Sequence, residues 1–193
     1  MTLRTLLDFV FPPQCGACER IGSGLCDACF PHGQLIVRRL PTLSVSAFGI
    51  YDGALRHAIL AMKNGRRDVA EAFAERLSSR IARDAIVVPV PTTAARRRQR
   101  GFDGCELIAR LAFESRVTAG LLQVRGETQR GRAREARLAF RPRFIWRGPP
   151  LNGTHVVLLD DVVTTGATLE ACAQTVRGAG GVVSEARVIA TVP

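Results

Sequence analysis

The stretch that decides the fold is "VLLDDVVTTGATL" at residues 157–169. Three apolar residues lead into two adjacent aspartates, two valines follow, and a turn rich in threonine and glycine then opens a helical pattern. A short apolar run bounded by turn residues is typical of a buried strand. The stretch therefore predicts a buried strand with two carboxylates near its end, followed at once by a tight turn into a helix.

The turn at residues 164–168 has the features of a phosphate-binding loop. It offers backbone N–H groups, hydroxyl groups and a helix N-terminus, and its glycine lets a ligand approach the backbone closely. Its residues are Thr164, Thr165, Gly166, Ala167 and Thr168. The loop lacks the lysine and spacing of the G-x-x-x-x-G-K-[ST] nucleotide loop, and it is not the dinucleotide pattern G-x-G-x-x-G.

Asp160 and Asp161 stand directly before this loop. Their carboxylates suit two neighbouring hydroxyls of a sugar, or a hydrated divalent cation, so the stretch as a whole describes a site for a ribose 5-phosphate. The simpler alternative is that Asp161 or Thr164 only caps the helix. One acidic cap is enough for that purpose, and a second carboxylate beside it would add like-charge repulsion. We therefore favour the ligand site.

Strand and helix patterns alternate along the rest of the chain, which predicts an α/β fold with a mainly parallel sheet covered by helices on both faces. The expected strands lie at 43–51, 85–90, 120–124, 138–146, 155–161 and 182–192, and the expected helices at 2–10, 53–63, 68–84, 105–115 and 168–180. In such sheets ligands bind beyond the carboxyl ends of the strands. A second unusual turn, "VPVPTTAARRRQRG" at 88–101, falls at such an end.

Four of the six cysteines form two C-x2-C knuckles, "CGAC" and "CDAC". Two such knuckles complete a closed tetrahedral site for structural zinc. Two disulfides are the alternative, disfavoured in a cytoplasmic chain, and a redox pair would need only one knuckle. The expected zinc ligands are Cys15, Cys18, Cys26 and Cys29. Cys105 and Cys172 lie in helical patterns and are expected to be small core residues.

The length of 193 residues suits one ordinary domain and a small appendage. We expect an N-terminal helix and cysteine module at 1–40 and the α/β domain at 41–193. No apolar run approaches the ~20 residues of a membrane span, and no signal-peptide pattern is present. The protein is therefore expected to be cytoplasmic.

The chain is strongly basic, with a formal net charge of +10. Its 27 basic residues are 26 arginines and a single lysine, Lys63, and 14 of the arginines lie between Arg96 and Arg147. A genome whose codon usage favours arginine is one explanation for the excess of arginine over lysine, but it does not explain the net charge. The charge indicates a nucleic acid or a polyphosphate as partner.

Four motifs follow one another in the order of a known family. They are the cysteine knuckles, "FGIYDGALRHAILAMKNGRRD" (48–68), "VVPVPTTAARRRQRGFDGCELIARL" (87–111) and the stretch at 156–169. In these motifs the chain resembles the ComF/GntX family. The last motif resembles the signature by which type I phosphoribosyltransferases bind phosphoribosyl diphosphate (PRPP). The resemblance covers nearly the whole chain and implies a type I phosphoribosyltransferase-like fold.

The resemblance also implies roles for individual residues. Asp160 and Asp161 would hold the ribose hydroxyls and act beside the sugar in catalysis, and residues 164–168 would hold the 5-phosphate. The diphosphate, bridged by Mg2+, would face a loop and three cations, namely Pro89, Val90, Pro91, Thr92, Lys63, Arg96 and Arg100. The chain departs from the family pattern in two places. Many relatives carry a further cysteine pair that is absent here. Relatives also carry a spaced series of Thr, Gln, Arg and Asn, to which only Gln129 and Arg137 of this chain correspond, and these two only weakly.

Three functions fit this pattern. A phosphoribosyltransferase of nucleotide or base salvage would displace diphosphate from C1 of the ribose, but no general base for an acceptor is evident. Members of the resembled family are associated with natural transformation, which implies single-stranded DNA and other competence proteins as partners. The arginine-rich 96–147 region would then follow a phosphate backbone, or it is simply a solvated basic face. The third function is that of a transcriptional regulator that senses PRPP, but the sequence shows no evident helix-turn-helix pattern. We favour a PRPP-binding, phosphoribosyltransferase-like competence protein.

Overall fold

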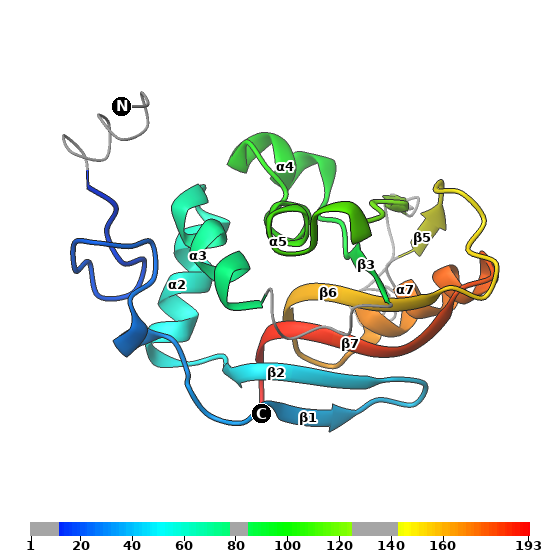
Figure 1. Cartoon of the computed structure of the whole chain (residues 1–193), viewed down its shortest axis with the longest axis horizontal. Coiled ribbons are helices and arrows are strands. Elements are labelled where there is room, and N and C mark those ends of the chain that lie inside the picture. The colour runs from blue at the N-terminus through cyan, green and yellow to red at the C-terminus, as the bar shows by residue number, and fades with distance from the viewer. Residues whose placement is uncertain (1–11, 78–84, 125–142) are drawn as a thin grey trace, which may run out of the picture.

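The computed structural model describes residues 12–77, 85–124 and 143–193 (Figure 1). The predicted helix at 2–10, the end of the one at 68–84 and the start of the strand at 138–146 lie outside these residues. The strands are β1 (Ile36–Arg39), β2 (Ser44–Ile50), β3 (Ile86–Pro89), β4 (Leu121–Val124), β5 (Arg143–Trp146), β6 (His155–Val163) and β7 (Val182–Thr191). The α-helices are α2 (Gly53–Lys63), α3 (Arg67–Leu77), α4 (Ala94–Arg100), α5 (Gly104–Phe113) and α7 (Ala167–Gly178), with short 3-10 turns η1 (Asp27–Cys29) and η2 (Glu114–Arg116).

The central sheet has five strands in the order β1-β2-β7-β6-β3. Strands β2, β7, β6 and β3 are parallel, and only β1 pairs antiparallel, with β2. The predicted mainly parallel α/β fold is confirmed. Strand β3 lies at the edge of the sheet, which explains how Pro89 is tolerated there, since an edge strand needs fewer backbone donors.

The sheet is buried on both faces, as its nearly continuous apolar strands require. One face, with Val157, Leu159 and Ile189, packs against α2, α3 and α5. The opposite face, with Leu158 and Val188, packs against α7 and the small β4-β5 sheet. Alternating residues of one strand thus pack into two separate hydrophobic cores, one on each face of the sheet. This packing on both faces fixes the strands up to their carboxyl ends.

Strands β4 and β5 form a separate two-stranded antiparallel sheet beside α7 (Figure 1). Its inner face carries Gln123 and Phe144, which are register partners, and Trp146. The Trp146 ring lies between two glycines: a Cβ added at Gly120 or Gly148 would fall 2.8 or 2.7 Å from its atoms. The indole Nε1 donates to the Pro149 carbonyl over 2.9 Å, which fixes the ring.

The cysteine module is joined to the first core by buried side chains. Cys15, Leu25 and Phe30 belong to the same apolar cluster as the helices α2 and α3. Gly24 lies so close to α3 that an added Cβ would fall 2.2 Å from the Asp68 carbonyl oxygen. Residues Ile36–Arg39 pair with β2 of the main sheet, and the domain boundary at residue 40 stays a prediction. Among the described residues no helix has the length and apolar character needed to cross a membrane.

Candidate functional site at the carboxyl edge of the sheet

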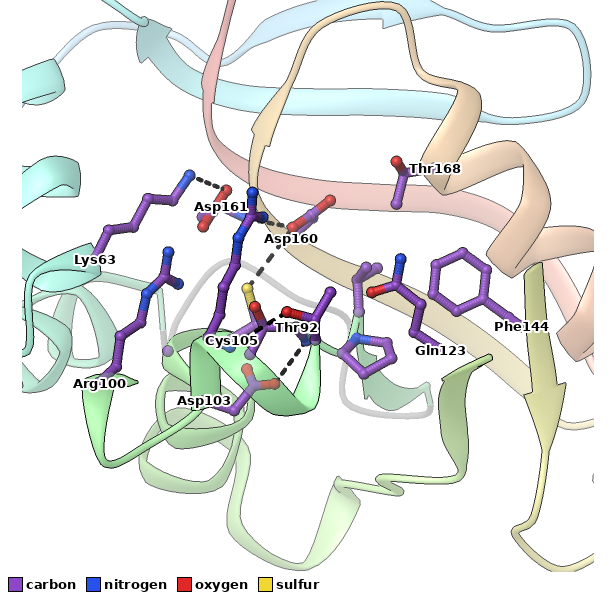
Figure 2. Close-up of a pocket in the computed structure, with 15 residues that line it drawn as sticks. Lys63, Thr92, Arg100, Asp103, Cys105, Gln123, Phe144, Asp160, Asp161 and Thr168 are labelled. Carbon is purple, nitrogen blue, oxygen red and sulfur yellow. Dashed lines mark hydrogen bonds and ion pairs between the residues drawn. The ribbon is translucent and has the colours of Figure 1, made fainter. Parts of the chain in front are cut away.

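A cavity of about 410 Å3 opens at the carboxyl ends of β3 and β6 (Figure 2). Side chains and loops from α2, β3, α4, α5, β4, β5, β6 and α7 meet there. The lining residues are Lys63, Val90, Pro91, Thr92, Thr93, Arg96, Arg100, Asp103, Gly104, Cys105, Gln123, Phe144, Asp160, Asp161 and Thr168. The structure therefore brings nine of the fourteen proposed PRPP-binding residues into one cavity.

The two aspartates lie within β6, not beyond its end, because the strand continues to Val163. Val162 and Val163 pair with Ala190 and Thr191 of β7, which extends the strand past the aspartates. Both carboxylates nevertheless reach the cavity. Neither caps α7, whose N-cap is Gly166 without a side-chain hydrogen bond. The simple capping alternative is therefore wrong for Asp161 and Thr164.

The two carboxylates have different partners (Figure 2). Lys63, the last residue of α2, donates from Nζ to Asp161 Oδ1 over 2.8 Å. Asp160 Oδ1 instead accepts the backbone N–H of Asp161 over 2.8 Å and faces the Cys105 thiol at 3.8 Å. Burial, followed by the negative charge of Asp161, raises the pKa of Asp160 to about 8. Asp160 is thus the protonated member of the pair at neutral pH.

The charge of the cavity follows from this pair. The lining holds three cations, Lys63, Arg96 and Arg100, and three carboxyl groups, Asp103, Asp160 and Asp161. With Asp160 protonated the lining is net positive at neutral pH. A net positive cavity favours an anionic ligand, although the ion pair with Asp161 offsets part of the charge of Lys63.

Cys105 was expected to be a small core residue, and it is buried in α5 as expected. It also lines the cavity, which no sequence signal indicated. Burial and the charges of Asp160 and Asp161 raise the pKa of its thiol well above the usual value. Cys105 therefore stays a neutral thiol and is a poor nucleophile.

The loop after β3 is held by a single buried carboxylate, that of Asp103. Its Oδ2 accepts the Thr92 N–H over 2.8 Å, and its Oδ1 accepts the Glu106 N–H over 3.2 Å at the start of α5. One side chain thus caps α5 and fixes the loop. Asp103 is not among the site residues predicted from the sequence, although the D-x-x-E spacing to Glu106 is typical of a capped helix start.

The arginine-rich turn after this loop forms a helix, α4, capped by Thr93, whose Oγ1 accepts the Arg96 N–H over 3.3 Å. It ends at Gly101, which has a left-handed φ of +80°. The helix places Arg96 and Arg100 at the cavity. Pro89, by contrast, lines a neighbouring cavity of about 340 Å3.

The expected phosphate loop lies between two cavities. Thr168 lines the main cavity, while Thr165 and Ala167 line an adjacent one of about 820 Å3 along α7. Gly166 adopts a φ of +83°, which favours glycine. Thr164 and Gly166 line neither cavity, and the Thr164 carbonyl accepts a hydrogen bond from Arg38. Phe144 lines both cavities and, with Gln123, was not anticipated from the sequence.

The four N-terminal cysteines form a second cluster, with all four Sγ atoms within 4.8 Å of one another. All are free of disulfides, and Cys18 Sγ lies 3.7 Å from Cys26 Sγ. A tetrahedral site with Zn–S bonds of about 2.3 Å has S–S edges of about 3.8 Å, so the spacing fits zinc. The two-disulfide alternative is wrong for this structure.

The thiols of this cluster differ in their surroundings. Burial of Cys15 opposes ionisation, but backbone N–H donors led by Cys26 outweigh it and lower the Cys15 pKa to about 6. Burial and the neighbouring thiols raise the pKa of Cys29. The cluster could hold a structural metal such as zinc, with a cation replacing the shared protons of the thiols.

No protein-family model matches the chain. The curated competence protein ComFC of Bacillus subtilis (strain 168) is 25% identical over 130 residues, which cover 64% of this chain and 54% of that protein. The match supports the resemblance to the ComF/GntX family. The chain spans about half the length of the curated relative that it matches. Gln129 and Arg137 lie outside the described residues.

Proposed function

We propose that this protein is a ComF-type, competence-related protein that binds PRPP at the carboxyl edge of its sheet. The observation that carries the proposal is the gathering of Lys63, Arg96, Arg100 and the two aspartates around one cavity. These residues come from three distant segments of the chain, α2, α4 and β6. A cavity lined by three cations and by two adjacent aspartates suits a sugar that bears several phosphates.

Each part of the ligand has a matching part of the site. Asp160 and Asp161 would accept hydrogen bonds from the two ribose hydroxyls, and the backbone of 164–168 would bind the 5-phosphate. The loop Pro89–Thr92, with Arg96 and Arg100, would bind the diphosphate, whose charge Mg2+ partly neutralises when bound. Lys63 would leave Asp161 as the ligand enters and add its charge to the diphosphate side.

Turnover as a phosphoribosyltransferase is the alternative within the same site. The acceptor would form a bond to C1 as the bond from C1 to the diphosphate oxygen breaks, and the diphosphate would leave with the bonding electrons. The Asp161 carboxylate would stabilise the positive charge that develops on the ribose, and the arginines would stabilise the negative charge on the leaving group. The acceptor is not defined by the described residues, so turnover is a separate question from binding.

A link to single-stranded DNA rests on the name of the curated relative and on charge. The relative is named a competence protein, and the net charge of +10 of this chain favours contact with a phosphate backbone. Arg97 and Arg98 of α4 are exposed next to the cavity, and Arg97 is paired with Glu106. We include in this proposal the binding of DNA and of other competence proteins. We also include zinc as the metal of the cysteine module, and a cytoplasmic location.

Calorimetry of PRPP with Mg2+ tests the site. A hydrogen bond to the charged Asp161 contributes about 1.5–3 kcal/mol and one to the neutral Asp160 about 0.5–1.5 kcal/mol, so the double change Asp160→Asn and Asp161→Asn should weaken binding by about 100-fold. Asp52→Asn is the control, because Asp52 is an exposed carboxylate at the start of α2 and does not line the cavity. Equal affinity of wild type and the double variant would refute the assignment of the site.

Two further measurements separate the alternatives. Diphosphate release with PRPP and a panel of purine and pyrimidine bases tests turnover, and silence with every acceptor would favour the binding protein. Binding of single-stranded DNA at increasing salt tests the nucleic-acid link, since each neutralised phosphate of a single strand adds about 0.7 to the slope of log affinity against log salt. A flat slope would exclude contact along a phosphate backbone.

A further inference from the structure

The hairpin formed by β1 and β2 contacts the expected phosphate loop, although neither strand was linked to the site by the sequence. Its first strand is antiparallel and lies at the edge of the sheet, far from the cavity lining in sequence. The end of β1 and the turn that follows it contact residues 164–170. Three alternate residues, Arg38, Leu40 and Thr42, contact this segment.

Arg38 makes the first contact, from β1. Its Nη1 donates to the Thr164 carbonyl over 2.9 Å, to Thr191 Oγ1 over 2.9 Å and to the Val192 carbonyl over 3.0 Å. One guanidinium nitrogen thus joins the start of the loop to the end of β7. All three acceptors are neutral oxygens, so these bonds do not cancel the charge of the arginine, which stays beside the loop.

Leu40 and Thr42 make the next two contacts. The Leu40 side chain covers Gly166, since a Cβ added at Gly166 would lie 2.5 Å from Leu40 Cδ1. Thr42 donates from its backbone N–H and its hydroxyl to the two carboxylate oxygens of Glu170, over 3.0 and 2.5 Å. Arg177 donates in turn to the Thr42 hydroxyl over 2.8 Å. The turn of the hairpin is therefore fixed to α7.

We propose that Arg38 is a positioning residue that holds residues 164–168 in the conformation that binds the 5-phosphate. Oriented N–H groups bind a phosphate well only if they are already aligned, because alignment upon binding costs conformational entropy. Arg38 fixes the carbonyl of Thr164, the residue from which the loop departs β6. The inference deepens the proposed function and rests on it for the identity of the ligand, but not for the order of the loop.

Hydrogen exchange measures the order of the loop without any ligand. In Arg38→Ala the amides of 165–168 should exchange about tenfold faster than in the wild type, since one hydrogen bond to a charged group is lost. Arg39→Ala is the matched control, because Arg39 is the exposed neighbour of Arg38 on the same strand, and it should leave these amides unchanged. Unchanged exchange in Arg38→Ala would overturn the inference, whether or not PRPP binds.

Binding of fragments distinguishes positioning from general damage to the fold. Ribose 5-phosphate should bind Arg38→Ala about tenfold more weakly than the wild type, whereas inorganic diphosphate with Mg2+ should bind both equally. Arg38→Lys keeps the charge and donors and should restore part of the affinity for ribose 5-phosphate. Equal weakening for both fragments would refute a specific role in the phosphate loop. If the wild type bound neither fragment, the proposed function would be refuted. The role of Arg38 in ordering the loop would then be tested by hydrogen exchange alone.

Discussion

The cysteine cluster and the cavity at the sheet edge are built in opposite ways. The four cysteines lie within fifteen residues of one another, and short loops bring their sulfur atoms together. The cavity instead draws on segments from Lys63 to Thr168, so the whole sheet must fold before it exists. We expect the stability of the local cysteine cluster to depend on the metal that it could hold. The geometry of the cavity depends instead on the folded sheet, and should survive single substitutions that leave the sheet intact.

The largest expected effect is on the cysteine cluster. Cys15→Ser removes a fully buried ligand that also belongs to the core shared with α2 and α3. We expect loss of bound metal and a decrease of about 3 kcal/mol or more in stability, which corresponds to a fall of about 6–12 °C in the unfolding temperature. Metal analysis and thermal unfolding, with and without a chelator, measure both effects. Cys105→Ala is the control and should retain the metal, because Cys105 lies outside the cysteine cluster. Retention of the metal by Cys15→Ser would contradict the role of Cys15 as a ligand.

The next effect concerns Asp160 and depends on pH. Asp160 keeps its proton in the folded protein up to a pH of about 8, whereas the ordinary pKa is 3.8. The folded state therefore binds more protons than the unfolded state between these values, and stability falls as pH rises through them. Asp160→Asn removes this dependence and should be more stable than the wild type at pH 8 by about 1–2 kcal/mol, with little difference near pH 4.

Urea unfolding across this pH range measures the difference. Asp52→Asn removes an exposed carboxylate and supplies the control. An Asp160→Asn variant that is less stable than the wild type at pH 8 would contradict the raised pKa of Asp160. A gain in stability with loss of PRPP affinity would show that Asp160 is retained for the ligand and not for the fold.

An effect of comparable size is expected for the loop after β3. Asp103→Ala removes the cap of α5 and the bond to the Thr92 N–H, and should cost about 2 kcal/mol. Asp103→Asn keeps one carbonyl acceptor and should lose about half as much. Chemical denaturation gives both values. Equal stability of Asp103→Ala and the wild type would mean that the loop is held by the strand alone.

The smallest effect is expected at the surface of α5. Arg110 pairs with Glu106 over 2.9 Å, one helical turn away, and both ends of the pair are accessible to solvent. Arg110→Ala should cost no more than about 0.5 kcal/mol and leave PRPP binding unchanged. A loss above 1 kcal/mol, measured by denaturation, would indicate that the network around Glu106 supports α5 more than an exposed pair normally does.

The sequence predicts those features that depend on neighbouring residues. The cysteine knuckles and the turn at 164–168 are local, and the mainly parallel sheet follows from the alternation of strand and helix patterns. The extension of β6 to Val163 was not predictable, because it depends on pairing with β7. The approach of Cys105, Gln123 and Phe144 to the cavity depends on how α5 and the β4-β5 sheet pack, which no pattern along the chain records.

The single tryptophan of the chain gives the protein a built-in optical probe. Trp146 follows Phe144 by two residues on β5, and its ring is held between Gly120 and Gly148. A ligand that shifts β5 at the cavity wall would alter the surroundings of this one fluorophore. Ligand titrations can therefore be followed by intrinsic emission, without a label, and the signal comes from one known place in the molecule.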